Sequence, residues 1–286
     1  MVIVNKSISF IEVNLSFEGF YINLDTSIDR RNFMENQINR LGLEKIIKRK
    51  PASVGDTYYS QILTAGELGC FLSHKSLIKG LGAKVGLILE DDVILPTNFT
   101  EAVCKLTDKV KELNWDIIFL GTSFDYTDLY RIRTMLRHIG RIDDLHSPQF
   151  EGFDLIPANP WYVFGTFAYL VNPDAAAKIH QILELEMSLG FPKQIDLVYR
   201  DSVRTGKISA ALVFPFLVGV SDEFTTDISS RPDTKEHRRK LKALNLFVGR
   251  HSKNDLLLDS YRNLNFDFDE HAFIVSQIVY EFLLDR

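Results

Sequence analysis

Three consecutive acidic residues, Glu90, Asp91 and Asp92, follow directly after the apolar run Val85–Leu89. A compact apolar run of this length predicts a buried strand, and ligands of open α/β sheets bind beyond the carboxyl ends of the strands. Adjacent carboxylates repel one another unless a cation lies between them or water screens them. Hard cations such as Mg²⁺ and Mn²⁺ prefer oxygen ligands and are commonly shared with substrate phosphates. The cluster therefore indicates a metal and phosphate site.

The spacing within this cluster allows its carboxylates to bind different groups. Glu90 and Asp92 lie on the same side of an extended chain, so one carboxylate can reach a metal while the other reaches a ribose or a metal-bound water. The alternative is an acidic turn that only faces solvent after a buried strand. The cluster alone does not separate the two interpretations.

The segments around the cluster alternate between strand and helix patterns. Apolar runs predict strands at Gly19–Leu24, Lys45–Lys50, Val85–Leu89, Trp115–Leu120, Tyr162–Val171 and Ala211–Val220. Helical spacing and capping signals predict helices at Asp29–Leu41, from Thr64 to Gly80, at Phe99–Leu113 and at Pro173–Leu189. This alternation predicts an α/β fold with a mixed, mostly parallel sheet and helices on both faces.

The predicted α/β domain covers residues 19–225, between an N-terminal extension of residues 1–18 and a helical C-terminal appendix of residues 226–286. Within the domain, Gly121–Pro160 breaks the alternation with Gly, Pro, Asp and aromatic residues. A long irregular segment in a compact domain is usually functional, so a lid or acceptor loop is expected there, with an ordinary insertion as the alternative.

The composition excludes several classes of protein. A net charge of −5 over 286 residues gives no basic field, so nucleic acid is not an expected partner. Cys70 and Cys104 lack the spacing of a zinc or disulfide framework and are expected to be reduced core residues. Neither a signal peptide nor an apolar stretch long enough to span a bilayer is evident. The protein is therefore expected in the cytoplasm.

Five segments, taken in order, resemble those of glycosyltransferase family 25, which includes bacterial lipooligosaccharide galactosyltransferases and collagen galactosyltransferases. They are Tyr21–Arg31, Thr64–His74, Leu87–Val93, Gly165–Val171 and Lys193–Asp196. The third is similar to the family's variant of the metal-binding Asp-x-Asp motif, whereas Gln194-Ile195 stands where the family usually has Pro-Val. The resemblance implies a GT-A fold, inverting transfer and a UDP-sugar donor, most often UDP-galactose.

The resemblance also implies roles for the acidic cluster. Asp92 is expected to bind the metal directly, Glu90 to bind the metal or the donor ribose, and Asp91 to lie beside the donor. The metal would neutralise the diphosphate of the leaving UDP. Mn²⁺ is expected ahead of Mg²⁺, although ligand types alone do not separate these two cations.

Other donor-binding residues are expected after the first strand, where GT-A enzymes place the nucleotide. They are Asn23, Asp25, Arg30 and Arg31. Arginine suits a phosphate, but the alternative is that both arginines pair with carboxylates on the surface of a helix that Asp29 caps.

Gly165 and Thr166 are also expected at the donor, because a glycine lets backbone approach a ligand closely. Tight packing explains this glycine equally well. His74 is interpreted as a buried residue that supports the acidic strand, and Trp161 and Tyr162 either stack on an acceptor sugar or belong to the core.

Asp196 is the predicted general base, because inversion by direct displacement needs a carboxylate that takes the proton of the attacking hydroxyl. Asp196 could instead cap a helix or bind the acceptor. Asp201, Asp222 and Glu223 remain alternative bases.

The expected function is thus transfer of galactose from UDP-galactose to a sugar hydroxyl of lipooligosaccharide, and the missing signal peptide favours a bacterial enzyme over a lumenal collagen-modifying one. The basic patch Lys235–Lys240 could rest on the inner face of a membrane, or be a solvated helix face. Two rivals are a catalytically silent sugar- or protein-binding module and a metal-dependent phosphohydrolase. The intact acidic cluster argues against the first, and Asp25 with Asp29 is a poor version of the second metal cluster that the phosphohydrolase requires.

Overall fold

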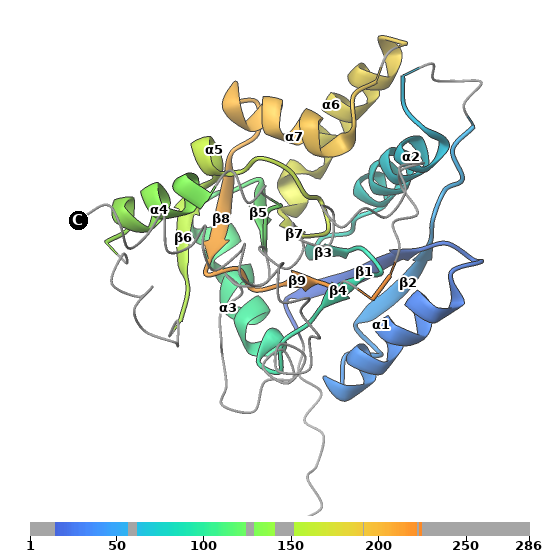
Figure 1. Ribbon diagram of the computed structural model, residues 1–286, viewed down its shortest axis with the longest axis horizontal. Helices are drawn as coiled ribbons and strands as arrows, with labels where there is room; N and C mark the ends of the chain where they lie inside the picture. The colour runs from blue at the N-terminus through green and yellow to red at the C-terminus, as the bar shows by residue number, and fades with distance from the viewer. Residues whose placement is uncertain are drawn as a thin grey trace, which may run out of the picture.

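The computed structural model in Figure 1 describes residues 15–56, 62–123, 129–140, 152–190, 192–221 and 223–224. The predicted C-terminal appendix, the patch Lys235–Lys240 and most of the N-terminal extension lie outside these residues.

The described chain is built around a seven-stranded sheet with the strand order β2-β1-β3-β7-β5-β8-β6. The strands are β1 (Phe17–Asn23), β2 (Ile47–Pro51), β3 (Val85–Leu89), β5 (Ile117–Phe119), β6 (Asp154–Pro157), β7 (Ala168–Val171) and β8 (Ala210–Phe214). Strands β7 and β6 run antiparallel to their neighbours, and the remaining strands share one direction. The predicted mixed, mostly parallel sheet is confirmed. A two-stranded sheet pairs β4 (Val93–Ile94) with β9 (Gly219–Val220).

Helices cover both faces of the large sheet, as predicted. They are α1 (Ile28–Arg40), α2 (Ala65–Lys79), α3 (Phe99–Glu112), α4 (Leu129–His138), α5 (Ala158–Trp161), the 3₁₀ turn η4 (Pro173–Ala175), α6 (Ala176–Ser188) and α7 (Ile195–Arg204). In Figure 1, α2, α6 and α7 lie on one side of the sheet, and α1 and α3 lie on the other. None of the described helices is long and apolar enough to cross a membrane.

Burial on both faces of the sheet explains why the sequences of the central strands are continuously apolar. Val85, Leu87, Ile88 and Leu89 of β3 have no exposed surface, because helices cover both faces of the sheet. Strand β7 pairs with β3 up to Leu89, and the backbone N–H of Glu90 donates to the carbonyl of Phe167 at 2.8 Å. The acidic cluster therefore begins where the central ladder ends.

The ends of α1 and α2 carry the predicted signals with one exception: Ser27 is the N-cap of α1, and Asp29, expected as the cap, lies inside its first turn. Thr64 and Glu67 form the complete capping box at the start of α2, with Thr64 Oγ1 accepting from the Glu67 N–H at 3.2 Å and Glu67 Oε2 accepting from the Thr64 N–H at 2.8 Å. Gly42, with φ of +67°, follows the end of α1 in a conformation that a side chain would disfavour.

Three predicted elements differ from the structure. The segment Gly121–Pro160 contains α4, β6 and part of α5, which are too short to stand out among its turn residues. The strand predicted at Tyr162–Val171 is confined to β7, because Gly165 adopts φ of +98° and interrupts the extended chain. The strand predicted at Ala211–Val220 divides into β8 and β9, since Pro215 has no N–H to donate to a ladder.

The side chain of Gln37 connects α1 to the segment that follows the acidic cluster. Its Nε2 donates to the carbonyl of Val93 at 2.9 Å, and its Oε1 accepts from the N–H of Leu95 at 2.8 Å. Gln37 is only 8% exposed, so both backbone groups would be buried without a partner if the amide were removed.

We expect Gln37→Leu to lower the free energy of unfolding by about 2–3 kcal/mol, because two buried backbone groups lose their hydrogen bonds. Denaturant unfolding of the variant and the parent measures this. The matched control is Asn36→Leu on the exposed side of α1, which should change the stability by less than about 0.5 kcal/mol. Equal effects of the two substitutions would show that Gln37 does not hold β4.

Candidate active site

The carboxyl ends of β1 and β3 meet at one edge of the sheet, because these strands are adjacent and parallel. Strand β1 ends at Asn23, and β3 ends just before the acidic cluster. Residues that are distant in the sequence therefore lie together, and most of the predicted site residues lie at this edge.

Arg30 of α1 binds two of the acidic residues. Its Nη1 lies 2.6 Å from Asp91 Oδ1 and 3.0 Å from Asp92 Oδ2, and Asn23 Nδ2 donates to Asp91 Oδ2 at 2.7 Å. Arg30 and Asp91 are only 9% and 8% exposed. Buried charges need such partners, so Arg30, predicted at the donor, and Asp91 serve first to hold the acidic cluster in place.

Asp92 retains an oxygen that no described residue engages. Asp91 uses both carboxylate oxygens within the protein, whereas Asp92 Oδ1 is buried and has no hydrogen-bond partner in the described part of the chain. Burial raises the pKa of Asp92, and the charges of Glu90 and Asp91 add to this effect against the opposing charge of Arg30. A cation beside Oδ1 would favour the ionised form, so Asp92 fits the metal ligand that the sequence predicts.

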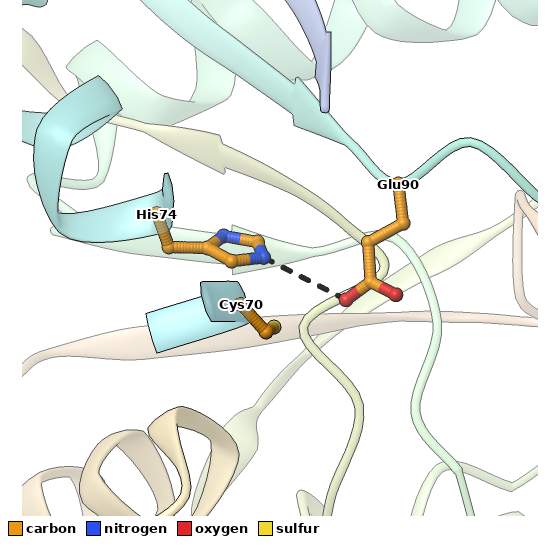
Figure 2. A group of neighbouring side chains, drawn as sticks. All are labelled: Cys70, His74 and Glu90. Atoms are coloured by element: carbon orange, nitrogen blue, oxygen red, sulfur yellow. Dashed lines mark ion pairs between the residues drawn. The ribbon is translucent and has the colours of Figure 1, made fainter. Parts of the chain in front are cut away.

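Glu90 turns toward α2 and the start of β7, as Figure 2 shows in part. Its Oε1 lies 3.3 Å from Thr166 Oγ1 and 3.6 Å from His74 Nε2. His74 has no exposed surface, and its Nδ1 lies 2.8 Å from the hydroxyl of Tyr169. His74 therefore lies beside the acidic strand, in the supporting position expected of it, and Thr166 lies beside Glu90, while its contact with the donor stays a prediction.

Gly165 lies where a side chain would not fit. A Cβ at this position would approach the Phe167 ring to 2.8 Å and the backbone nitrogen of Ser123 to 3.0 Å, and φ of +98° adds strain. The tight-packing alternative for this glycine is therefore sufficient. Its backbone N–H also hydrogen-bonds Asp196.

Asp196 lies in the first turn of α7, where its Oδ1 accepts from the N–H of Leu197 at 2.8 Å. Burial raises the pKa of this carboxyl, the N–H groups of Leu197 and Gly165 lower it, and the charge of Glu90 raises it. Asp196 is therefore close enough to Glu90 to feel its charge. A raised pKa makes a carboxylate a stronger base.

Of the alternative bases that the structure describes, only the exposed Glu223 lies near the acidic cluster: its N–H donates to Ser221 Oγ at 3.2 Å, and the Ser221 N–H donates to the Asp92 carbonyl at 2.7 Å. Asp201 forms a surface ion pair with Lys193 at 2.8 Å, with its side chain 38% exposed. Asp222 is not among the described residues. Tyr162 is buried and stacks on Phe119 with ring centroids 3.8 Å apart, so it belongs to the core rather than to an acceptor surface.

Asp25 and Arg31 lie at the outer rim of the site. The Asp25 carboxylate is 78% exposed and lies 3.8 Å from Arg31 Nη2 and 2.5 Å from Arg49 Nη2. Arg49 of β2 was not predicted at the site, yet it also donates to Asn23 Oδ1 at 2.8 Å. The register of the neighbouring strand, which pairs Tyr21 with Arg49, decides this position, and the sequence pattern of β2 carried no signal for it.

A cavity of about 250 Å³ opens beside the cluster, between the end of β1, the segment 52–55 and the first half of α2. Glu90 and Asp91 form part of its wall. Gly55 and Gly69 line this cavity, and neither was predicted at the site. A Cβ on Gly55 would lie 2.1 Å from the Ala65 carbonyl oxygen, and a Cβ on Gly69 would lie 2.6 Å from the Ser53 carbonyl oxygen. Glycines spaced along the helix that starts at Thr64 were the available signal of this close approach.

Comparison with known proteins identifies a matching family. The profile of glycosyltransferase family 25, described as an LPS biosynthesis protein, matches residues 17–192. The match contains β1, α2 and the acidic cluster and ends before Asp196.

Curated relatives agree with this match over part of their length. Procollagen galactosyltransferase 1 of Danio rerio is 32% identical over 179 residues, which cover 61% of this chain and 26% of the relative. A glycosyltransferase 25 family member of Aedes aegypti is 29% identical over 205 residues, which cover 64% of this chain and 31% of the relative. The human inactive glycosyltransferase 25 family member 3 is 41% identical over 71 residues, which cover 23% of this chain and 12% of the relative. The matches thus span between about a quarter and a third of the first two relatives and less of the third.

We expect Arg30→Met to lower the free energy of unfolding by about 3–5 kcal/mol at pH 8, because it leaves buried carboxylates without their cationic partner. The loss should shrink as the pH falls toward 5. Burial raises the pKa of Asp91 and Asp92 in the folded protein, so these carboxyls take up protons at a higher pH than in the unfolded chain. Once they are neutral, the missing guanidinium no longer leaves a buried charge unpaired.

Denaturant unfolding at the two pH values measures both effects. Arg31→Met is the matched control, because the side chain of Arg31 is 26% exposed, and it should cost less than about 1 kcal/mol. A pH-independent loss in the Arg30 variant would contradict the assigned ion pairs.

Proposed function

Because the chain belongs to glycosyltransferase family 25, we propose that it is a metal-dependent, inverting galactosyltransferase that uses UDP-galactose. The observation that carries this proposal is the buried, unpartnered Oδ1 of Asp92 beside Glu90, at the end of the central strand β3. This arrangement offers oxygen ligands to a hard cation at the sheet edge where α/β proteins bind ligands.

The nucleoside of the donor occupies the cavity between β1 and α2. About 250 Å³ suits a nucleoside better than a whole sugar nucleotide, so the diphosphate and the sugar extend past the acidic cluster. Glu90 lines the cavity and is positioned for the ribose hydroxyls or the metal. Galactose is proposed because a relative of 32% identity is named a galactosyltransferase.

Asp92 and Glu90 would hold the divalent cation, with Mn²⁺ proposed ahead of Mg²⁺. A bound cation of this kind neutralises the diphosphate and stabilises UDP as a leaving group. Arg30 keeps the Asp92 carboxylate in position through Oδ2 and leaves Oδ1 for the cation.

Asp196 is proposed as the base. The acceptor oxygen attacks the anomeric carbon opposite UDP and forms the new glycosidic bond as the bond from that carbon to the UDP oxygen breaks. The electron pair of that bond leaves with UDP, and the hydroxyl proton passes to the Asp196 carboxylate. The hydrogen bonds from the Leu197 and Gly165 N–H groups orient this carboxylate.

The proposed acceptor is a sugar hydroxyl of lipooligosaccharide, at the cytoplasmic face of a membrane. The family description as an LPS biosynthesis protein supports this acceptor, whereas the procollagen galactosyltransferases among the relatives support a collagen acceptor. The net charge of −5 supports a glycan acceptor over nucleic acid.

A second candidate is a module that binds a nucleotide sugar without transferring it. Two observations favour it: a relative is named inactive, and Arg30 already neutralises part of the acidic cluster. The two candidates differ in whether UDP is released.

We expect UDP release from UDP-galactose in the presence of Mn²⁺, stimulated by a sugar acceptor, and its loss by at least about 100-fold in Asp92→Asn because the amide binds the cation poorly. A panel of UDP-sugars, with and without acceptors, identifies the donor. Asp108→Asn on the exposed face of α3 is the matched control and should retain full activity. Tight binding of UDP-galactose without release under every acceptor tested would favour the silent module, and no binding to any UDP-sugar would refute both.

We expect Asp196→Asn to lower kcat by about 10²–10⁴-fold with little change in the donor KM, because the amide cannot accept the proton. In the parent, log(kcat/KM) should fall as the pH drops below the pKa of Asp196, which burial raises above its ordinary value of 3.8. This acidic limb should vanish in the variant. A variant that keeps both the rate and the limb would exclude Asp196 as the base.

A further inference from the structure

Cys70, His74 and Glu90 form a cluster (Figure 2) that lines part of the cavity, and we propose that this cluster binds Zn²⁺. The site is distinct from the oxygen-ligand site at Asp92, although the two share the flexible carboxylate of Glu90. It uses one sulfur, one nitrogen and one oxygen, which is a ligand set that zinc accepts and that Mn²⁺ does not favour.

The geometry comes from one helix and one strand end. Cys70 and His74 are four residues apart on α2, so their side chains lie on the same face of the helix. Glu90 reaches them from the end of β3, and the potential ligand atoms all lie within 4.8 Å of one another. Within this group, His74 Nε2 and Glu90 Oε1 are 3.6 Å apart. Tetrahedral zinc places neighbouring ligand atoms roughly 3.3–3.8 Å apart, so small rotamer changes complete the site.

His74 is prepared for a ligand by its hydrogen bonds. Its Nε2 is buried and has no hydrogen-bond partner in the described ranges, whereas its Nδ1 lies 2.8 Å from the Tyr169 hydroxyl. That hydroxyl lies 3.5 Å from the hydroxyl of Tyr199, which gives it a further partner. Metal-binding histidines commonly donate their other ring N–H to such an acceptor, which fixes the ring and directs the free nitrogen lone pair at the metal.

The charges around Cys70 favour a cation. Burial raises the pKa of the Cys70 thiol, and the negative charges of Glu90, Asp196, Asp92 and Glu67 raise it further. Zinc would replace their repulsion of a thiolate with attraction, and the thiol proton would pass to solvent as the sulfur binds.

The three ligands all line the cavity of about 250 Å³. Three protein ligands leave a fourth tetrahedral position, which here faces the cavity and is available to water or to an oxygen of a bound molecule. If the proposed function is correct, zinc in this site also engages Glu90 and should inhibit the Mn²⁺-supported reaction.

Cobalt(II) spectroscopy tests the site without reference to catalysis. The chain has only two cysteines, so a cobalt–thiolate charge-transfer band in the near ultraviolet reports on Cys70 or Cys104 alone. We expect one equivalent of Co²⁺ to produce this band together with intense visible bands typical of tetrahedral cobalt, and one equivalent of Zn²⁺ to abolish them.

Variants identify the ligands. Cys70→Ser should abolish the band, whereas the matched control Cys104→Ser on α3 should retain it. His74→Gln should weaken Co²⁺ binding by at least about 100-fold, and Tyr169→Phe, which removes only the hydrogen-bonded hydroxyl, by roughly 10–100-fold. Circular dichroism of the metal-free variants separates loss of binding from loss of fold.

Absence of the band from the folded parent at saturating Co²⁺ would overturn the zinc site, as would a band that survives Cys70→Ser. These outcomes do not bear on UDP release, so a failed zinc site and a failed transferase remain distinguishable. Zinc inhibition of UDP release in the parent that disappears in Cys70→Ser would link the two sites.

Discussion

The guanidinium of Arg30 joins three parts of the fold that are distant in the sequence. It comes from α1, binds the two aspartates that follow β3, and lies beside Asn23 at the end of β1, which binds one of the same aspartates. Removing so many charges and amides from water is costly unless every group is paired. This constraint fixes the edge of the sheet at which the cavity, Glu90 and Asp196 meet.

The pairing is incomplete in a way that matters for function. One guanidinium pairs with two aspartates, Glu90 Oε1 lies 3.6 Å from His74 Nε2, and Asp92 keeps a buried oxygen without a partner among the described residues. The surplus of negative charge favours a bound cation. Glu90 lies between two groups of metal ligands: the oxygens of Asp92 on one side, and the sulfur of Cys70 with the nitrogen of His74 on the other. Its carboxylate therefore links the proposed catalytic metal and the proposed zinc.

Close backbone packing shapes the space around these charges. Gly55 and Gly69 let the segment 52–55 rest directly against α2, and the Ser53 N–H donates to Ser73 Oγ at 2.8 Å. Gly165 similarly brings backbone beside Asp196. The cavity wall is therefore mostly backbone and small side chains, which leaves polar recognition to a few residues at its inner end.

The sequence by itself determined the alternation of strands and helices, the capping box at Thr64 and the position of the acidic cluster after β3, because periodicity and capping are local properties of the chain. It also pointed to Asp196 and Gly165, although only through resemblance to a family. The tertiary structure decided which carboxylate has a free oxygen, because the partners of Asp91 and Asp92 come from β1 and α1. It alone brought Arg49 to Asn23 and the Cys70 sulfur to Glu90, because strand register and helix packing depend on segments that are distant in the sequence.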